Sequence, residues 1–166
     1  NKPTSVSKFK NIINFTGTAL PKKMFISYCS ANAQHMHQLS KNLKVLQEAN
    51  MIDFWYDRMI QPGTNWDENI QKELQEADVI LFLVSSDFLL SKYIMGKEVP
   101  MAIALSKNKN LEILLVEDCL FEDTILSSTQ LVTNSGVQKE IFKIIDPLDQ
   151  SLWKKYITHL KSVLKN

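Results

Sequence analysis

Short apolar runs alternate with segments of helical spacing along most of the chain. The apolar runs predict five β-strands, at Met24–Tyr28, Met51–Asp57, Asp78–Val84, Leu111–Glu117 and, more weakly, around Ile141–Ile145. The segments between them predict helices over about Ala33–Ala49, Trp66–Glu76, Ser85–Leu105, Phe121–Ser127 and Gln150–Leu164. Continuously apolar strands that alternate with helices are typical of a parallel sheet that is covered on both faces. We therefore expect a three-layer α/β fold with a five-stranded parallel sheet in the order 2-1-3-4-5.

Local signals refine the helices and the domain boundary. Ser30 can cap the first helix, because a serine oxygen accepts a hydrogen bond from a free amide of the first turn. The helix after the third strand should be irregular near Gly96 and Pro100, since a proline inside a helix removes a backbone hydrogen bond. Residues 1–22 show no clear period and are expected to form an N-terminal arm or linker. The remainder, residues 23–166, is sized for one domain with its own core.

One acidic residue, Glu98, lies among apolar neighbours. On a helix its neighbours at i±3 and i±4 are Ile94, Met95, Met101 and Ala102. The ordinary explanation is a side chain whose stem lies on the apolar surface while its carboxylate reaches solvent, because an ionised group loses hydration when it is buried. Ligands of open parallel sheets bind beyond the carboxyl ends of the strands, where the strand order reverses. The helix that carries Glu98 leaves the third strand, so we expect this carboxylate near that crevice.

Charge and composition narrow the partners and the compartment. The 19 basic and 18 acidic residues are interspersed and give a net charge of +1, so we expect neither nucleic acid nor an anionic membrane as a direct partner. The two cysteines are too few for a disulfide framework, and no apolar run approaches the length of a membrane span. The first residues also lack the apolar core of a signal peptide. We therefore expect a cytoplasmic protein.

Other chemistries fit the sequence less well. His35 and His37 are two residues apart and point to different faces of a helix, so with Cys29 they make a poor metal set, and we expect no metal. A Cys29 nucleophile would need a third, orienting group, which is not evident. The scattered glycines match no glycine-rich phosphate-binding motif. A phosphoacceptor domain shares the architecture but needs acidic residues after the first strand, where this chain has Tyr28, Cys29 and Ser30.

The segment after the second strand, WYDRMIQPGTNW at residues 55–66, carries most of the remaining information. Taken alone, it is an ordinary surface turn in which Pro62 and Gly63 supply the turn and the last tryptophan packs at the helix start. Its Met59 and Ile60 favour a second interpretation, because a monomer gains little from apolar side chains at a loop tip. The same segment is therefore also a candidate partner site.

Four segments together resemble the Toll/interleukin-1 receptor (TIR) domain family in its bacterial branch. They are FISY at 25–28, DFWYDRMIQPGTNWDENI at 53–70, ADVILFLVSSDFLLSKY at 77–93 and EVP at 98–100. The resemblance implies a flavodoxin-like fold and, as in many bacterial and plant members, cleavage of NAD+ at the nicotinamide–ribose bond. It places Glu98 at the position of the family's catalytic glutamate. Two positions depart from the pattern: Ile94 stands where many catalytic members have tryptophan, with Tyr93 beside it, and Asn32 replaces an acidic residue after the first strand.

The resemblance also implies roles around the catalytic position. Substrate contacts are expected from side chains at the strand exits and near the catalytic glutamate. They are the aromatic and polar Tyr28, Asp57, Trp66, Ser85, Ser86 and Tyr93, and the apolar Ile94. The loop after the second strand resembles the family's assembly loop, whose contact residues would be Arg58, Met59, Ile60, Pro62 and Gly63. NAD+ is then the substrate and no cofactor is needed. The implied partners are other TIR domains, bound head to tail, and an upstream sensor domain or protein, with activation by self-assembly in bacterial anti-phage immune signalling.

One carboxylate is chemically sufficient for this reaction. Ordinary glycoside hydrolysis needs a second carboxyl group to protonate a poor leaving group, whereas nicotinamide leaves NAD+ as a neutral molecule. A preorganised carboxylate can stabilise the oxocarbenium-like ribosyl centre, and capture by water or by the same molecule gives ADP-ribose or a cyclic ADP-ribose. Two other functions stay open. One is a non-catalytic TIR adaptor, and the other is a nucleoside deoxyribosyltransferase-like enzyme, which shares the sheet topology and N-glycosidic chemistry.

Overall fold

A single parallel sheet organises the molecule. The computed structural model describes residues 20–57, 65–128 and 141–165. The strands are β1 (Lys22–Ser27), β2 (Ile52–Tyr56), β3 (Val79–Val84), β4 (Asn110–Leu115) and β5 (Phe142–Lys143). They pair in the order β2-β1-β3-β4-β5, and all pairs are parallel. The expected fold class and strand order are therefore confirmed.

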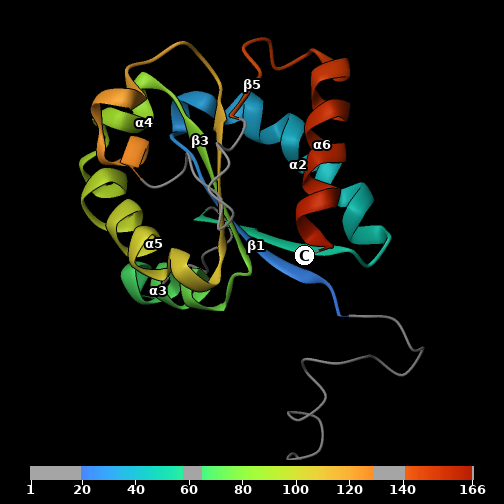
Figure 1. Ribbon diagram of the computed structural model, residues 1–166, viewed down its shortest axis with the longest axis horizontal. Coiled ribbons are helices and arrows are strands. Elements are labelled where there is room, and N and C mark those ends of the chain that lie inside the picture. The colour runs from blue at the N-terminus through green and yellow to red at the C-terminus, as the bar shows by residue number, and fades with distance from the viewer. Residues whose placement is uncertain (1–19, 58–64, 129–140, 166) are drawn as a thin grey trace, which may run out of the picture.

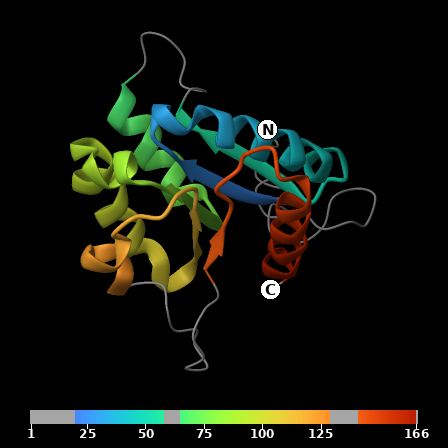
Figure 2. The ribbon, with the colours of Figure 1, turned by 90° about the horizontal axis from the view of Figure 1, so that it is seen from above.

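Helices cover both faces of this sheet (Figures 1 and 2). The longer helices are α2 (Ala33–Glu48), α3 (Trp66–Glu76), α4 (Ser86–Leu90), α5 (Val99–Leu105) and α6 (Gln150–Leu164). Figure 1 shows α2 and α6 on one side of the sheet and α3, α4 and α5 on the other. Alternate residues of β1 serve the two cores, since Met24 and Ile26 pack in the cluster of α2 and α6 whereas Phe25 packs in the cluster of α3 and α5. Strands that are buried on both faces explain why their sequences are continuously apolar.

Local sequence signals predicted some of the helix starts correctly and others wrongly. Helices α3 and α6 cover the predicted residues, and each begins with a side chain that accepts a hydrogen bond from a first-turn amide, Asn65 for α3 and Asp149 for α6. The predicted cap of α2 was wrong. Ser30 opens a short 3-10 turn, Ser30–Asn32, and Asn32 precedes α2 without a side-chain cap bond. The segment over Phe121–Ser127 also forms two 3-10 turns, Phe121–Asp123 and Ile125–Ser128, in place of one short helix.

The segment between β3 and β4 is broken, as its proline and glycine predict. Helix α4 ends at Leu90, and a π-helical turn, Ile94–Glu98, leads directly into α5. The amide of Val99 donates to the carbonyl of Ile94, five residues back, which is the π pattern. Pro100 stands in the first turn of α5, where its missing N–H costs least. The wide turn thus ends two residues before the proline and carries Glu98 as its last residue.

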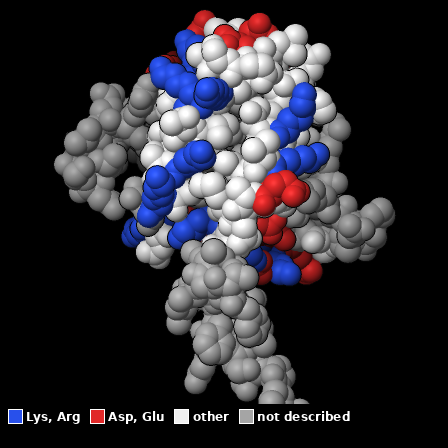
Figure 3. Space-filling view, turned by 90° about the vertical axis from the view of Figure 1, so that its right-hand side faces the viewer, with Lys and Arg blue, Asp and Glu red and all other residues white. Residues whose placement is uncertain are grey.

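The face formed by α2 and α6 shows basic side chains scattered between uncharged ones (Figure 3). Helix α6 contributes Lys154, Lys155 and Lys161 to the exposed surface. Between this face and the sheet, the ring of His35 is buried and hydrogen-bonds the carbonyl of Ile144 at 2.9 Å.

No helix in the described part of the chain is long and apolar enough to cross a lipid bilayer.

Candidate functional site

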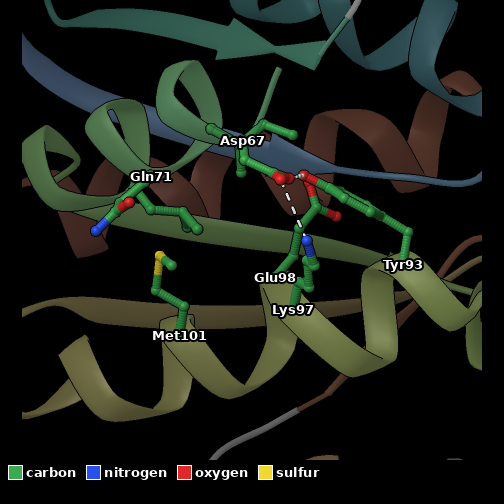
Figure 4. Close-up of a pocket in the computed structure, with 8 residues that line it drawn as sticks. Asp67, Gln71, Tyr93, Lys97, Glu98 and Met101 are labelled. Carbon is green, nitrogen blue, oxygen red and sulfur yellow. Dashed lines mark hydrogen bonds and ion pairs between the residues drawn. The ribbon is translucent and has the colours of Figure 1, made fainter. Parts of the chain in front are cut away.

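A pocket lies on the opposite face of the sheet, between α3 and the π-helical turn with α5. It has a volume of about 270 Å3 and is lined by Asp67, Ile70, Gln71, Leu74, Tyr93, Lys97, Glu98 and Met101. Ile70, Leu74 and Glu98 are buried, whereas Asp67 and Lys97 are exposed. The pocket therefore has an apolar floor with one buried carboxylate and a charged rim (Figure 4).

Glu98 is held at the end of β1, the neighbour of the central strand β3, by one short hydrogen bond. Its side chain is on a residue that is only 5% exposed, and the hydroxyl of Ser27 donates to Glu98 Oε2 at 2.8 Å. Ser27 is the last residue of β1 and pairs with Phe82 of β3. The carboxylate therefore lies at the carboxyl ends of β1 and β3, which is the crevice that the strand order predicts.

Burial strongly perturbs this carboxyl group. Loss of hydration raises the pKa of Glu98 from the ordinary 4.5 to about 7, because a charged carboxylate is disfavoured in a poorly solvated site. The Ser27 hydrogen bond acts in the opposite direction and lowers the pKa, and the nearby charge of Asp57 raises it further. No salt bridge to Glu98 is found among residues 20–57, 65–128 and 141–165. A buried, weakly supported acid in a pocket is a typical sign of a functional group.

The rim of the pocket is closed by a three-residue network. The Tyr93 hydroxyl donates to Asp67 Oδ1 at 2.7 Å, and Lys97 Nζ lies 3.1 Å from Asp67 Oδ2. The same ammonium stands 5.6 Å from the centre of the Tyr93 ring. These contacts hold the pKa of Asp67 below its usual value, with the Tyr93 hydrogen bond as the larger cause. Figure 4 shows Tyr93 and Lys97 meeting at Asp67 above Glu98.

The structure brings several of the sequence-predicted residues to this region. Tyr93 lines the pocket beside Glu98, and Asp57 acts on the pKa of Glu98. Trp66 is the first residue of α3, is 48% exposed and precedes the rim residue Asp67 in the sequence. Ile94 starts the π-helical turn and is buried in the core of that face. These four residues and the catalytic candidate come from three separate segments of the chain.

Two other predicted contact residues, Ser85 and Ser86, form hydrogen bonds that hold the local structure. The Ser85 side chain caps α4 by accepting from Phe88 N at 3.0 Å, and its hydroxyl donates to Asn32 Oδ1 at 2.6 Å. Ser86 is exposed, and its backbone amide donates to Glu117. The Ser85–Asn32 bond links the segments that follow β1 and β3, and neither serine lines the pocket.

Tyr28 lies away from the pocket. It is 7% exposed and packs edge to face on Tyr56, with ring centres 6.1 Å apart, in the core that faces α2 and α6. Because side chains alternate along a strand, Ser27 and Tyr28 point to opposite faces of the sheet. Tyr93 is therefore the aromatic side chain that this structure places beside the carboxylate.

Six pocket residues were not singled out from the sequence: Asp67, Ile70, Gln71, Leu74, Lys97 and Met101. A periodic signal marks them. The α3 residues are spaced i, i+3, i+4 and i+7, which puts them on one side of a helix, and Lys97 and Met101 are four residues apart. The predicted assembly loop, with Arg58, Met59, Ile60, Pro62 and Gly63, lies outside the described residues.

Thiols and histidines offer no competing centre in the described ranges. Cys29 and Cys119 are both free and half-buried. Burial raises the pKa of the Cys119 thiol, which disfavours the reactive thiolate. Among the residues that the structure describes, no group of three or more His, Cys, Asp and Glu side chains could hold a metal ion.

Comparison with known proteins identifies the family. A family model for the TIR domain matches residues 24–144, which is most of the chain and includes both Ser27 and Glu98. The chain belongs to the TIR domain family. It is 35% identical over 80 residues to the uncharacterized protein y4lF of Sinorhizobium fredii (strain NBRC 101917 / NGR234). That match covers 48% of this chain and 25% of the relative, so the chain spans only a small part of that relative's length.

Solved structures support the fold. The TIR domain of the Toll-related receptor TRR-2 from Hydra magnipapillata is similar with a TM-score of 0.57 at 13% identity, over 86% of this chain and 98% of that one. The structure of the RPS4 and RRS1 TIR domain heterodimer is similar with a TM-score of 0.54 at 13% identity, over 88% of this chain and 99% of the matched one. A diflavin flavoprotein A3 from Nostoc sp. gives 0.54 at 8% identity, over 87% and 94%. At these identities the likeness is one of fold alone.

Proposed function

We propose that this TIR domain is an NAD+ nucleosidase that cleaves the nicotinamide–ribosyl bond, with Glu98 as its catalytic carboxylate. The observation that carries the proposal is the position of Glu98. It is a 5% exposed acid at the carboxyl end of β1, it lines a pocket, and its pKa is raised to about 7. A protein that needed this helix only for packing would gain stability from an apolar residue there, since burial of a carboxyl group is costly.

One carboxylate, that of Glu98, is sufficient for the proposed reaction. Nicotinamide leaves as a neutral molecule, so no second carboxyl group has to donate a proton. As the bond breaks, positive charge develops on the ribosyl carbon, and an ionised Glu98 stabilises it in a site that excludes much of the solvent. The Ser27 hydroxyl holds the carboxylate in place. Water then forms the new bond to give ADP-ribose, or a group of the same molecule does so to give a cyclic ADP-ribose.

The raised pKa gives the proposed reaction a defined pH dependence. Only the ionised carboxylate stabilises the transition state, and a group with a pKa of about 7 is ionised in about half of the molecules at neutral pH. Turnover should therefore rise as the pH increases through about 7 and level off above it. This rise of turnover around pH 7 is absent if the group that limits the reaction is an ordinary exposed carboxylate.

Self-assembly is the second part of the proposal. The pocket of about 270 Å3 is just below the range of roughly 300–1,000 Å3 that small-molecule sites occupy, whereas a dinucleotide is a large ligand. Further walls from a neighbouring copy would enlarge it, and the RPS4 and RRS1 structure is a heterodimer of TIR domains. We propose that other TIR domains, bound head to tail through the loop after β2, complete the site, and that an upstream sensor clusters the chains in bacterial anti-phage signalling. Charged residues in place of Ile60 and Pro62 should then abolish any rise of specific activity with concentration.

The direct test of the function is product analysis. The protein is incubated with NAD+ over a wide range of protein concentrations, and nicotinamide, ADP-ribose and cyclic products are separated by chromatography. Release of nicotinamide that depends on Glu98 supports the enzyme. A folded chain that assembles but releases none supports the second candidate, a non-catalytic TIR adaptor, for which the shared fold of the TIR heterodimer is the favouring observation.

A further inference from the structure

The charges around the pocket are unfavourable for a dinucleotide, with one exception. Of the eight residues that line the pocket, Asp67 and Glu98 are acidic and Lys97 is the only basic one. The charge of Asp57 also reaches Glu98, where it raises the pKa. A dinucleotide carries two negative phosphate groups, which acidic walls repel. The Lys97 ammonium is the single pocket charge that attracts them.

Lys97 has the right position relative to the proposed catalytic group. It is the residue directly before Glu98 in the π-helical turn, so the two side chains leave the backbone from neighbouring positions. Glu98 points into the floor, whereas the Lys97 side chain is 61% exposed and its ammonium lies at the rim over the Tyr93 ring. A substrate bound through Lys97 would keep its phosphates at the rim while its ribosyl bond reaches the carboxylate below.

The partner of Lys97 can be exchanged for another anion. The side chains of Lys97 and Asp67 are 61% and 56% exposed, and exposed pairs of this kind contribute little to stability. A phosphate oxygen offers the ammonium the same kind of charge-assisted hydrogen bond as the Asp67 carboxylate does. Asp67 would not be stranded by the exchange, because it keeps the hydrogen bond from the Tyr93 hydroxyl.

We propose that Lys97 is the phosphate-binding residue of this pocket, and that Asp67 holds its ammonium at the rim until the diphosphate of a dinucleotide takes it. This inference rests on the proposed NAD+ cleavage. Asp67 and the diphosphate then compete for one cation. The competition separates a binding role from a structural one, because removing Lys97 and removing the charge of Asp67 must act in opposite directions on substrate affinity.

The test uses three variants of the full chain. Lys97→Gln removes the cation, and Asp67→Asn removes its competitor while an amide oxygen still accepts from Tyr93. Lys92→Gln is the matched control, since Lys92 is exposed, lies on the same segment and does not line the pocket. We expect KM for NAD+ to rise about tenfold in Lys97→Gln, the effect of losing one charge-assisted hydrogen bond, with kcat within about twofold. KM should fall about two- to threefold in Asp67→Asn and stay unchanged in Lys92→Gln.

Binding of ADP-ribose, measured by calorimetry with the same variants, separates the two proposals. If the protein turns over NAD+ but KM and the affinity for ADP-ribose are unchanged in Lys97→Gln, the phosphate-binding role is wrong and the proposed enzyme activity stands. No turnover, but ADP-ribose binding that weakens in Lys97→Gln and strengthens in Asp67→Asn, overturns the enzyme and supports the phosphate role. If both variants weaken binding alike, the Lys97–Asp67 pair is structural and the inference is wrong. Absence of both turnover and binding overturns both proposals.

Discussion

The hydroxyl of Ser27 donates a 2.8 Å hydrogen bond to the buried carboxylate of Glu98, across 71 residues of sequence. This bond joins the end of β1 to the π-helical turn and is the hydrogen bond by which the described residues support this acid. It also opposes the effect of burial on the pKa of Glu98. The Ser27 hydrogen bond therefore helps to fix where the carboxylate lies and lowers the pH at which it becomes charged.

Replacing Ser27 by alanine should make Glu98 a weaker acid. The carboxylate loses the hydrogen bond that favours its ionised form, so the midpoint of the pH–rate profile moves upward from about 7. Loss of one hydrogen bond of about 1 kcal/mol changes the acid constant about fivefold, so at pH 7 the ionised fraction of Glu98, and with it kcat, should fall about threefold and recover at higher pH. Ser40→Ala is the control, since Ser40 is a buried serine of the other core. An unchanged midpoint in Ser27→Ala contradicts this role.

Removing the charge of Asp57 should shift the same profile the other way. Asp57 raises the pKa of Glu98 through its negative charge, so Asp57→Asn should move the midpoint below about 7. The opposite signs of the two shifts are diagnostic, because a general loss of structure would not move the midpoint downward in one variant and upward in the other. Measurement of kcat from pH 5 to 9 for both variants tests the pair. A shift of Asp57→Asn to higher pH would contradict the assignment.

The cost of burying Glu98 should be visible in stability. Well below pH 4.5 the carboxyl group is neutral in both states, but between pH 4.5 and about 7 it ionises mainly in the unfolded chain, so stability falls as the pH rises. Glu98→Gln removes this penalty and should be more stable than the wild type at pH 8 by up to about 3 kcal/mol, with little difference at pH 4. Urea unfolding at both pH values measures it, with exposed Glu48→Gln as the control. A Glu98→Gln protein that is less stable at pH 8 would show that the charge is compensated.

The fold could be predicted from the sequence because its signals are local and repeated. Strands buried on both faces read as apolar runs, and α3 and α6 have clear helical spacing. The predicted cap at Ser30 failed because the chain first makes a 3-10 turn, which no residue pattern distinguished from the start of α2. The break after β3 was expected from Gly96 and Pro100.

The site was predictable only where a residue contradicts its surroundings. Glu98 stood out as a carboxylate among apolar neighbours, and the strand order placed it near the crevice. Its partner Ser27 did not stand out, since the two residues meet only through the register of β1 against β3 and the widened turn before Pro100. The rim residues Asp67 and Lys97 are ordinary surface charges in the sequence, and only the packing of α3 beside α5 joins them.

Trp66 offers a test of binding against packing. It is 48% exposed, so Trp66→Ala should change the free energy of unfolding by less than about 1 kcal/mol, whereas Trp153→Ala, in the core, should cost about 3–5 kcal/mol. If Trp66, the neighbour of the rim residue Asp67, contributes to substrate binding, KM for NAD+ should rise severalfold in Trp66→Ala. Thermal unfolding and steady-state kinetics measure both effects. A variant that loses stability but keeps its KM would assign Trp66 to packing.

The central claim is that Glu98 performs the chemistry, and one measurement tests it most directly. Wild-type protein and Glu98→Gln, both shown to be folded, are incubated with NAD+ at the same high concentration and at pH 8, and released nicotinamide is quantified. Because the amide keeps the size and hydrogen bonding of the carboxyl group but not its charge, the account predicts a fall in turnover of at least about 100-fold. Near-equal nicotinamide release by the two proteins, or none from the wild type at any concentration, would contradict it.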